Sequence, residues 1–164
     1  MLETWVAVVL ANFCLVMILG AAFFMLVNRL VVGHQVSTAE IVFRWLVLFG
    51  LGFTGLYTFV MHAFYPALTA AQIGWPTSPF QYEVAMADLA FGVLGVLAFH
   101  ARDGFRLATV IGAAIWLWGD AAGHLYQWVV FQNGMSGNAG SWLWMDIIVP
   151  LVLIICIIKM RRAR

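Results

Sequence analysis

The sequence predicts an all-α integral membrane protein, a bundle of five transmembrane helices that forms one domain over residues 1–164. The first observation is composition: 65% of the residues are hydrophobic and 9% are charged, whereas about a quarter of a soluble domain is charged. The second is length, since a spanning helix needs roughly 20 mainly apolar residues and five stretches provide them. The third is that every Lys and Arg lies at the same set of predicted helix ends.

The five predicted helices cover about 4–28, 40–62, 80–101, 105–131 and 141–159. The first has no basic residue before its apolar run, so we expect a retained helix and not a signal peptide. The second begins at Glu40 and Arg44, whose spacing of four predicts a surface ion pair. The third begins with a capping box, in which Ser78 caps, Pro79 takes the first helical position and Gln81 completes the pattern.

Turns, glycines and a proline predict how the last two helices are arranged. The short turn HARDGF joins the third helix to the fourth, so we expect these two to be antiparallel neighbours. In the fourth helix, Gly119 and Gly123 form a GxxxG pattern that would let another backbone approach closely. Pro150 would kink the fifth helix. The long connection of residues 63–79 is uncharged and rich in proline and aromatic residues, which predicts an interfacial turn or short helix.

The distribution of basic residues predicts the orientation. Residues 63–79 and 132–140 contain no Lys or Arg, so these two connections are expected outside the cell. The N-terminus is then outside and the C-terminus is cytoplasmic, in a multi-pass protein of the inner membrane. The basic residues that would face the cytoplasm are Arg29, Arg44, Arg102, Arg106, Lys159, Arg161, Arg162 and Arg164.

Polar side chains that are costly in lipid gather at one depth, the outer half of the membrane. At about 1.5 Å of rise per residue, all five helices contribute to this layer. Asp120, His124 and Gln127 share one helix face by their spacing of four and seven. Glu83 and Asp88 are five apart, about 140° around a helix, so we expect Glu83 to face the shared layer and Asp88 another neighbour. The layer as a whole consists of Asn12, His62, Glu83, Asp88, Asp120, His124, Gln127 and Asp146.

Ionisable groups in a membrane are a functional-site hypothesis by default. We therefore expect a pocket that opens to the periplasmic side and binds a divalent metal ion, zinc, iron or manganese, for which carboxylate and imidazole ligands are suitable. The predicted metal ligands are His62, Glu83, Asp120 and His124. The residues predicted to support them or to handle protons are Asn12, Asp88, Gln127 and Asp146. Whether such a metal would perform catalysis is left open.

Several alternatives stay open at this point. The polar layer can be a structural hydrogen-bond network with protonated acids. It can serve a proton- or cation-coupled transporter, although the inner half of the membrane contains almost no titratable group. A haem held by His62 and His124 ranks below a non-haem metal, because the two histidines lie at different depths. The chain can also be a non-catalytic subunit of a larger membrane complex, or form a homo-oligomer. The basic tail predicts a topology anchor and no nucleic-acid partner.

The blocks IGWPTSPFQYEVAMADLAFGVLG and WLWGDAAGH resemble those of small prokaryotic polytopic membrane proteins that are grouped as a domain of unknown function. The resemblance covers the second to fourth helices. The chain is also distantly similar to DoxX-like small membrane proteins, although those have four helices and this chain is predicted to have five. Proteins of the first kind have no established activity, so the resemblance implies a fold and no mechanism.

Overall fold

A computed structural model describes residues 8–33 and 35–163, and every regular element within these ranges is a helix. The predicted all-α class is therefore confirmed. The elements are α2 (Phe13–Val32), α3 (Thr38–Leu46), the π-helix η1 (Val47–Phe53), α4 (Thr54–Phe64), α5 (Pro66–Ile73), α6 (Phe80–Ala98), α7 (Asp103–Phe131), α8 (Ser136–Ala139) and α9 (Ser141–Arg162).

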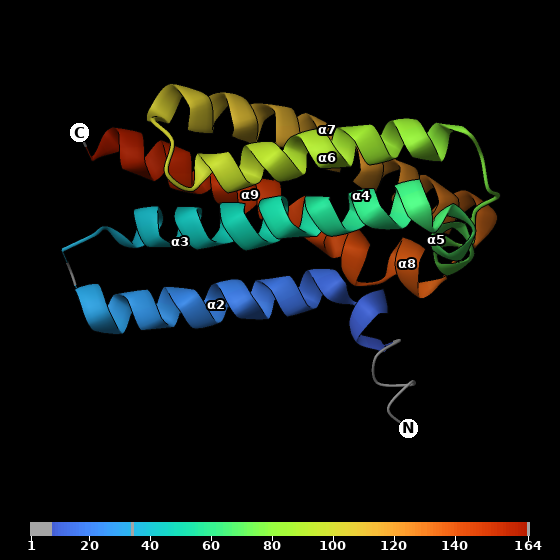
Figure 1. The fold of residues 1–164 in the computed structure, drawn as a ribbon, viewed down its shortest axis with the longest axis horizontal. Coiled ribbons are helices and arrows are strands. Elements are labelled where there is room, and N and C mark those ends of the chain that lie inside the picture. The colour runs from blue at the N-terminus through green and yellow to red at the C-terminus, as the bar shows by residue number, and fades with distance from the viewer. Residues whose placement is uncertain (1–7, 34, 164) are drawn as a thin grey trace.

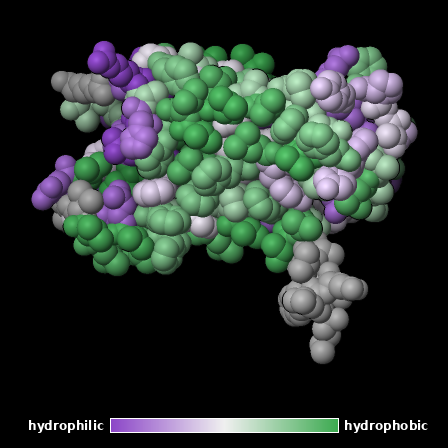
Figure 2. All heavy atoms as spheres, in the orientation of Figure 1, coloured by the Kyte–Doolittle hydropathy of each residue, from purple (hydrophilic) through white to green (hydrophobic). Residues whose placement is uncertain are grey.

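The long helices lie side by side along the longest axis of the molecule, and the chain reverses direction at each connection (Figure 1). The short helices α5 and α8 lie together at one end, which we call the α5/α8 end. The opposite end holds the α2–α3 and α6–α7 connections and the C-terminal end of α9, and we call it the basic end. On the face seen in Figure 2, apolar residues form a band across the middle and hydrophilic residues gather at both ends.

Within the described residues, four helical stretches are long and apolar enough to cross a membrane, namely Phe13–Val31, Thr38–Phe64, Phe80–Ala98 and Ser136–Arg162. They are compatible with a multi-pass membrane protein. The fifth predicted span corresponds to α7, which has 29 residues but is not one of the four. Its length is sufficient, but Arg106, Asp120 and His124 make it less apolar than the others. The fifth crossing and the orientation of the chain stay predictions.

The first predicted helix differs from the structure in two ways. Its expected start near residue 4 lies outside the described residues. Residues 8–11 are helical, but the helix is interrupted at Asn12, and α2 begins at Phe13. At this break, the side-chain amide and the backbone N–H of Asn12 both donate to the Val8 carbonyl (3.1 Å each), while Oδ1 accepts from the Ser141 hydroxyl (3.1 Å).

The capping box predicted at the start of α6 is present in part, since α6 begins at Phe80 and Pro79 precedes the first helical residue. The Ser78 hydroxyl accepts from the backbone N–H of Phe80 at 3.2 Å, and the Ser78 N–H donates to Oε1 of Gln81 at 3.4 Å. The amide of Gln81 also donates to the carbonyl of Pro66 at the start of α5, at 3.0 Å. The expected short helix between the second and third spans is α5, and Gln81 ties it to α6.

Glycines determine how closely two of the long helices approach. A Cβ atom on Gly95 of α6 would lie 2.6 Å from the backbone nitrogen of Gly52, and one on Gly55 would lie 2.9 Å from the carbonyl of Asp88. The predicted approach at Gly119 and Gly123 was wrong. Nothing lies within 4 Å of a Cβ placed on Gly119, and a Cβ on Gly123 meets only the ring of Trp75, at 3.8 Å.

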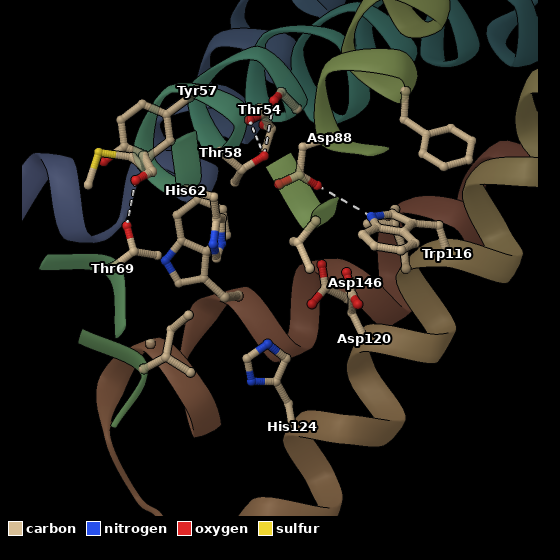
Figure 3. A pocket seen from close by; sticks show the side chains of 18 of the residues that line it. Thr54, Tyr57, Thr58, His62, Thr69, Asp88, Trp116, Asp120, His124 and Asp146 are labelled. Atoms are coloured by element: carbon tan, nitrogen blue, oxygen red, sulfur yellow. Dashed lines mark hydrogen bonds between the residues drawn. The ribbon is translucent and has the colours of Figure 1, made fainter. Parts of the chain in front are cut away.

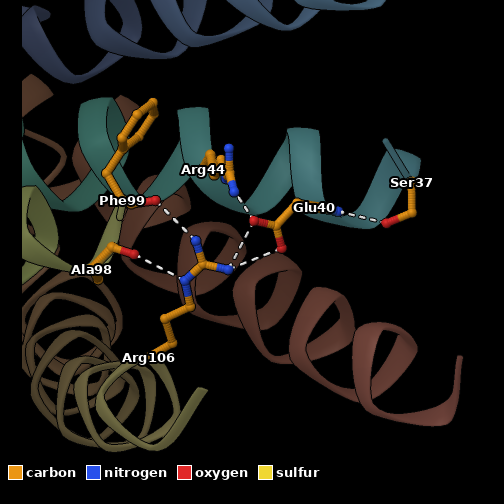
Figure 4. Close-up of polar contacts among 6 residues, drawn as sticks. All are labelled: Ser37, Glu40, Arg44, Ala98, Phe99 and Arg106. Atoms are coloured by element: carbon orange, nitrogen blue, oxygen red, sulfur yellow. Dashed lines mark hydrogen bonds and ion pairs between the residues drawn. The ribbon is translucent and has the colours of Figure 1, made fainter. Parts of the chain in front are cut away.

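Arg106 joins three helices at the basic end (Figure 4). Its guanidinium donates to both oxygens of Glu40 at 2.9 Å and to the carbonyls of Ala98 (3.0 Å) and Phe99 (2.9 Å) at the end of α6. Arg44 pairs with the same carboxylate, so the predicted Glu40–Arg44 ion pair is part of a larger cluster. The apolar core continues from this cluster along the molecule through Phe43, Val47 and their neighbours.

Candidate functional site

A cavity of about 120 Å³ lies among α4, α6, α7 and α9, and residues of α5 and α8 also line it. Its base is formed in part by Gly50 and Leu51 of the π-helix η1, which leads into α4. Figure 3 shows that side chains from several helices converge on this space. The polar and aromatic residues that line it include Thr54, Tyr57, Thr58, His62, Thr69, Gln72, Asp88, Phe91, Trp116, Asp120, His124, Trp142 and Asp146.

Three carboxyl groups face the cavity and are close enough to interact electrostatically. Asp88 is 9% exposed, and its Oδ1 accepts from the indole N–H of Trp116 at 3.3 Å. The carboxyl groups of Asp120 and Asp146 lie side by side (Figure 3), and neither accepts a hydrogen bond from any residue in the described ranges. Two acids from different helices therefore keep their hydrogen-bonding capacity for the contents of the cavity.

The imidazole of His124 is oriented by Asn138, which is completely buried in α8. The amide nitrogen of Asn138 donates to the carbonyls of His124 (3.1 Å) and Asn133 (2.9 Å). Its Oδ1 therefore faces Trp75 and His124, and Nδ1 of His124 lies 3.0 Å from it. Since Oδ1 can only accept, Nδ1 carries a proton, and the lone pair of the neutral ring is on Nε2. The ring of Trp75 packs against the imidazole, with centroids 5.2 Å apart.

His62 lies at the junction of two pockets. It lines the cavity and also a more open pocket at the α5/α8 end, which is formed with Pro66, Ser78 and Gln81 among others. Its Nδ1 atom is buried and has no hydrogen-bond partner among the described residues. A buried polar atom without a partner is costly, so a water or a ligand is expected to contact it.

The structure brings together five of the eight predicted residues: His62, Asp88, Asp120, His124 and Asp146 all line the cavity. Glu83 is exposed and is not among the lining residues, whereas Asp88 is buried and faces the cavity. The two acids of α6 do face different directions, as their spacing requires, but with the predicted orientations reversed. Asn12 and Gln127 do not line the cavity either, because Asn12 is engaged with Ser141 and Gln127 lies beyond His124 toward the end of α7.

The predicted metal centre is not preformed. Within residues 8–33 and 35–163, no group of three His, Cys, Asp or Glu side chains is placed so that it could hold a metal ion. Asp120 and His124 lie one turn apart on α7, and the other acids reach the cavity from α6 and α9. Metal binding therefore stays a prediction, and it requires some of these side chains to move closer together.

Sequence reasoning missed several residues of the site. Asn138 is the most important, and its position in a short polar connection gave no signal of burial. Thr69 and Gln72 come from α5 and cover the cavity. The π-helical turn at Val47–Phe53 was also not predicted, although single π-turns are frequent at functional sites. The only sequence feature that could have indicated an irregular turn here is the pair of glycines Gly50 and Gly52.

Similarity to known proteins agrees with the predicted resemblance. A model described as a family of unknown function, DUF6790, matches residues 11–164. No curated protein and no solved structure matches the chain. The chain belongs to the DUF6790 family.

Proposed function

We propose that this DUF6790 protein is a membrane-embedded binding protein, and that the cavity at its α5/α8 end takes up a small cation. The observation that carries the proposal is the pair of carboxyl groups of Asp120 and Asp146, which face the cavity without a hydrogen-bond donor in the described structure. Asp88 adds a third carboxyl group. A bound cation would neutralise the negative charge of these buried carboxylates.

The surroundings of the cavity contain no fixed positive charge. None of the residues that line it, all within the described ranges, is Lys or Arg. The basic side chains lie instead at the opposite end, where Arg106 and Arg44 share Glu40. Unpaired buried charge is expensive, so the three acids must be neutralised by protons or by a bound cation. A divalent metal ion is one such cation, with Asp120, Asp146 and Nε2 of His124 as the nearest candidate ligands.

The base of the cavity favours binding over simple conduction. Below Leu51 and Gly50 the interior is apolar, formed by residues such as Val47, Leu153 and Val110 of the core cluster. A channel needs polar groups or water along its length. With α7 crossing the membrane as the fifth span and the basic end in the cytoplasm, the cavity would face the outside of the inner membrane.

Thermal unfolding of the purified full-length protein in lipid nanodiscs tests the proposal. Mn²⁺, Zn²⁺, K⁺ and ethylammonium chloride would each be titrated at constant ionic strength. At least one is expected to raise the melting temperature saturably, because a ligand at 100 times its Kd stabilises the folded state by about 2.7 kcal/mol. Asp120→Asn combined with Asp146→Asn should remove the effect, while Glu83→Gln, an exposed acid on α6, should retain it. If no cation stabilises the wild-type protein, the proposal is overturned.

A further inference from the structure

We infer that the cation bound in this cavity is a small primary ammonium ion, R–NH₃⁺ with a short apolar R group. The inference rests on the proposed function and names its ligand class. It is carried by the polarity of the cavity lining, whose free polar atoms are almost all hydrogen-bond acceptors. It is also carried by the aromatic rings that stand among these acceptors.

The hydroxyl and indole donors of the lining are already used within the protein. The hydroxyl of Thr54 donates to the carbonyl of Phe49 at 2.9 Å, and that of Thr58 donates to the carbonyl of Gly55 at 3.0 Å. The indole N–H of Trp116 donates to Asp88 at 3.3 Å. The remaining hydroxyl and indole donors follow the same rule, with Tyr57 bound to the Leu10 carbonyl, Thr69 to the Met61 carbonyl and Trp142 to the Ala11 carbonyl.

What remains for a ligand is therefore a set of acceptors from two helices, α7 and α9. These are the carboxyl oxygens of Asp120 and Asp146 and Nε2 of His124, whereas the carboxyl group of Asp88 already interacts with Trp116 and Thr58. The amide of Gln72 and the ring of His62 can act in either role. A ligand that satisfies such a lining must bring several donors and positive charge, and a protonated primary amine brings three N–H groups and one charge.

Spacing separates an ammonium ion from a metal ion. Tetrahedral ligands at about 2.1 Å from a metal lie about 3.4 Å from one another. Acceptors at about 2.8 Å from an ammonium nitrogen lie about 4.6 Å apart, so they can remain on separate helices. Within the described residues no three His, Cys, Asp or Glu side chains meet the requirement for a metal. An ammonium ion therefore accepts a wider arrangement of acceptor atoms than a metal ion does.

Aromatic rings provide the environment for the carbon part of the ligand. Phe91 and Trp116 stack with centroids 6.3 Å apart, and Tyr57 and Trp142 stack at 6.2 Å, and all four line the cavity. Ring faces attract an ammonium group by cation–π interaction and bury alkyl groups favourably. A cavity of about 120 Å³ limits the ligand to a few carbon atoms.

Two isosteric cations test the inference in the wild-type, full-length protein in nanodiscs. Tert-butylammonium and tetramethylammonium have the same charge and nearly the same shape, but the first has three N–H donors and the second has none. Ethylammonium is the smaller primary ammonium ion. Affinities come from isothermal titration calorimetry, with Mn²⁺ and Zn²⁺ measured in parallel. At least one primary ammonium ion is expected to bind roughly tenfold or more tightly than tetramethylammonium, because tetramethylammonium cannot donate any hydrogen bond to the carboxyl groups.

The variants provide the second readout. Asp120→Asn with Asp146→Asn should abolish ammonium binding, and Glu83→Gln should leave it unchanged. If the double variant does not fold, the comparison of the isosteric cations in the wild-type protein decides alone. Equal or tighter binding of tetramethylammonium overturns the inference. Binding of Mn²⁺ or Zn²⁺ with no binding of either primary ammonium ion also overturns it and leaves the proposed function standing, whereas binding of no cation at all overturns both.

Discussion

Nδ1 of His124 lies 3.0 Å from Oδ1 of Asn138, so a buried amide in the four-residue helix α8 determines which nitrogen of a cavity imidazole carries the proton. The same amide accepts from Trp75 and donates to two backbone carbonyls. One side chain thereby connects the cavity to both the α5–α6 and the α7–α9 connections. Asn138 therefore both holds the α5–α6 connection through Trp75 and sets the proton position on His124.

Asn138→Ala should destabilise the protein and weaken cation binding together. The substitution removes a partner from the Trp75 indole, from Nδ1 of His124 and from the Asn133 carbonyl, and a buried polar group left unsatisfied costs about 1–3 kcal/mol. We expect a lower melting temperature in nanodiscs and a higher Kd for the stabilising cation. Gln132→Ala is the control, since that exposed side chain bonds only to the Val129 carbonyl. An Asn138→Ala protein as stable as this control would contradict the role of Asn138.

Asp146→Asn should make the cation-free protein more stable. Without a cation, the buried Asp146 carboxyl must either carry a charge beside Asp88 and Asp120 or bind a proton, and both cost free energy at neutral pH, whereas an amide of the same shape is neutral. Single stabilising substitutions commonly contribute about 0.5–2 kcal/mol. The measurement is thermal unfolding without added cation, with Glu83→Gln as the matched acid-to-amide control outside the cavity. A loss of stability would indicate that Asp146 has a structural role instead.

Gly95→Ala should disturb the contact between α6 and η1. Its Cβ would lie 2.6 Å from a backbone nitrogen, and neither backbone can move without separating the two helices. Overpacking of this kind costs about 1–3 kcal/mol or more. Gly119→Ala on α7 is the control, because nothing lies within 4 Å of the added methyl group. Thermal unfolding of both variants measures the difference, and equal stabilities would show that the close approach does not exist.

Arg106→Ala should be much more damaging than Arg44→Ala. The side chain of Arg106 is 6% exposed and makes four hydrogen bonds to Glu40 and the end of α6, whereas that of Arg44 is 41% exposed. Removing one partner of a buried ion pair costs about 3–5 kcal/mol, and an exposed pair contributes about 0–1 kcal/mol. Chemical or thermal unfolding of the two variants in the same nanodiscs compares them. Similar losses would mean that Glu40 is solvated by water and that Arg106 does not hold the basic end together.

The sequence predicted most of the fold and about half of the site, for reasons that individual residues explain. Apolar length and the capping residues Ser78 and Gln81 determine the helices locally, so their positions were predictable. Which of Glu83 and Asp88 faces the interior depends on the rotation of α6, which is set by the close contact of Gly95 with Gly52 in a different helix. The sequence alone does not show which two glycines of different helices will contact each other. Asn138 was missed because its burial results from the packing of α8 against α5, α7 and α9.

The fifth crossing can be tested by labelling the two ends of α7. In a chain with Cys14 and Cys156 replaced by alanine, Gly104→Cys and Gln132→Cys each place one thiol near an end of the 29-residue helix. At about 1.5 Å per residue, the two positions are about 42 Å apart, enough to span the hydrocarbon core of about 30 Å. A membrane-impermeant maleimide added to intact cells should label the Gln132→Cys thiol, and the Gly104→Cys thiol should react only after the membrane is opened. The positive-inside distribution gives this direction, because Arg102 and Arg106 flank Gly104 and no basic residue lies near Gln132. If both thiols react from the same side, α7 does not cross the membrane, and the cavity cannot face the outside in the way we propose.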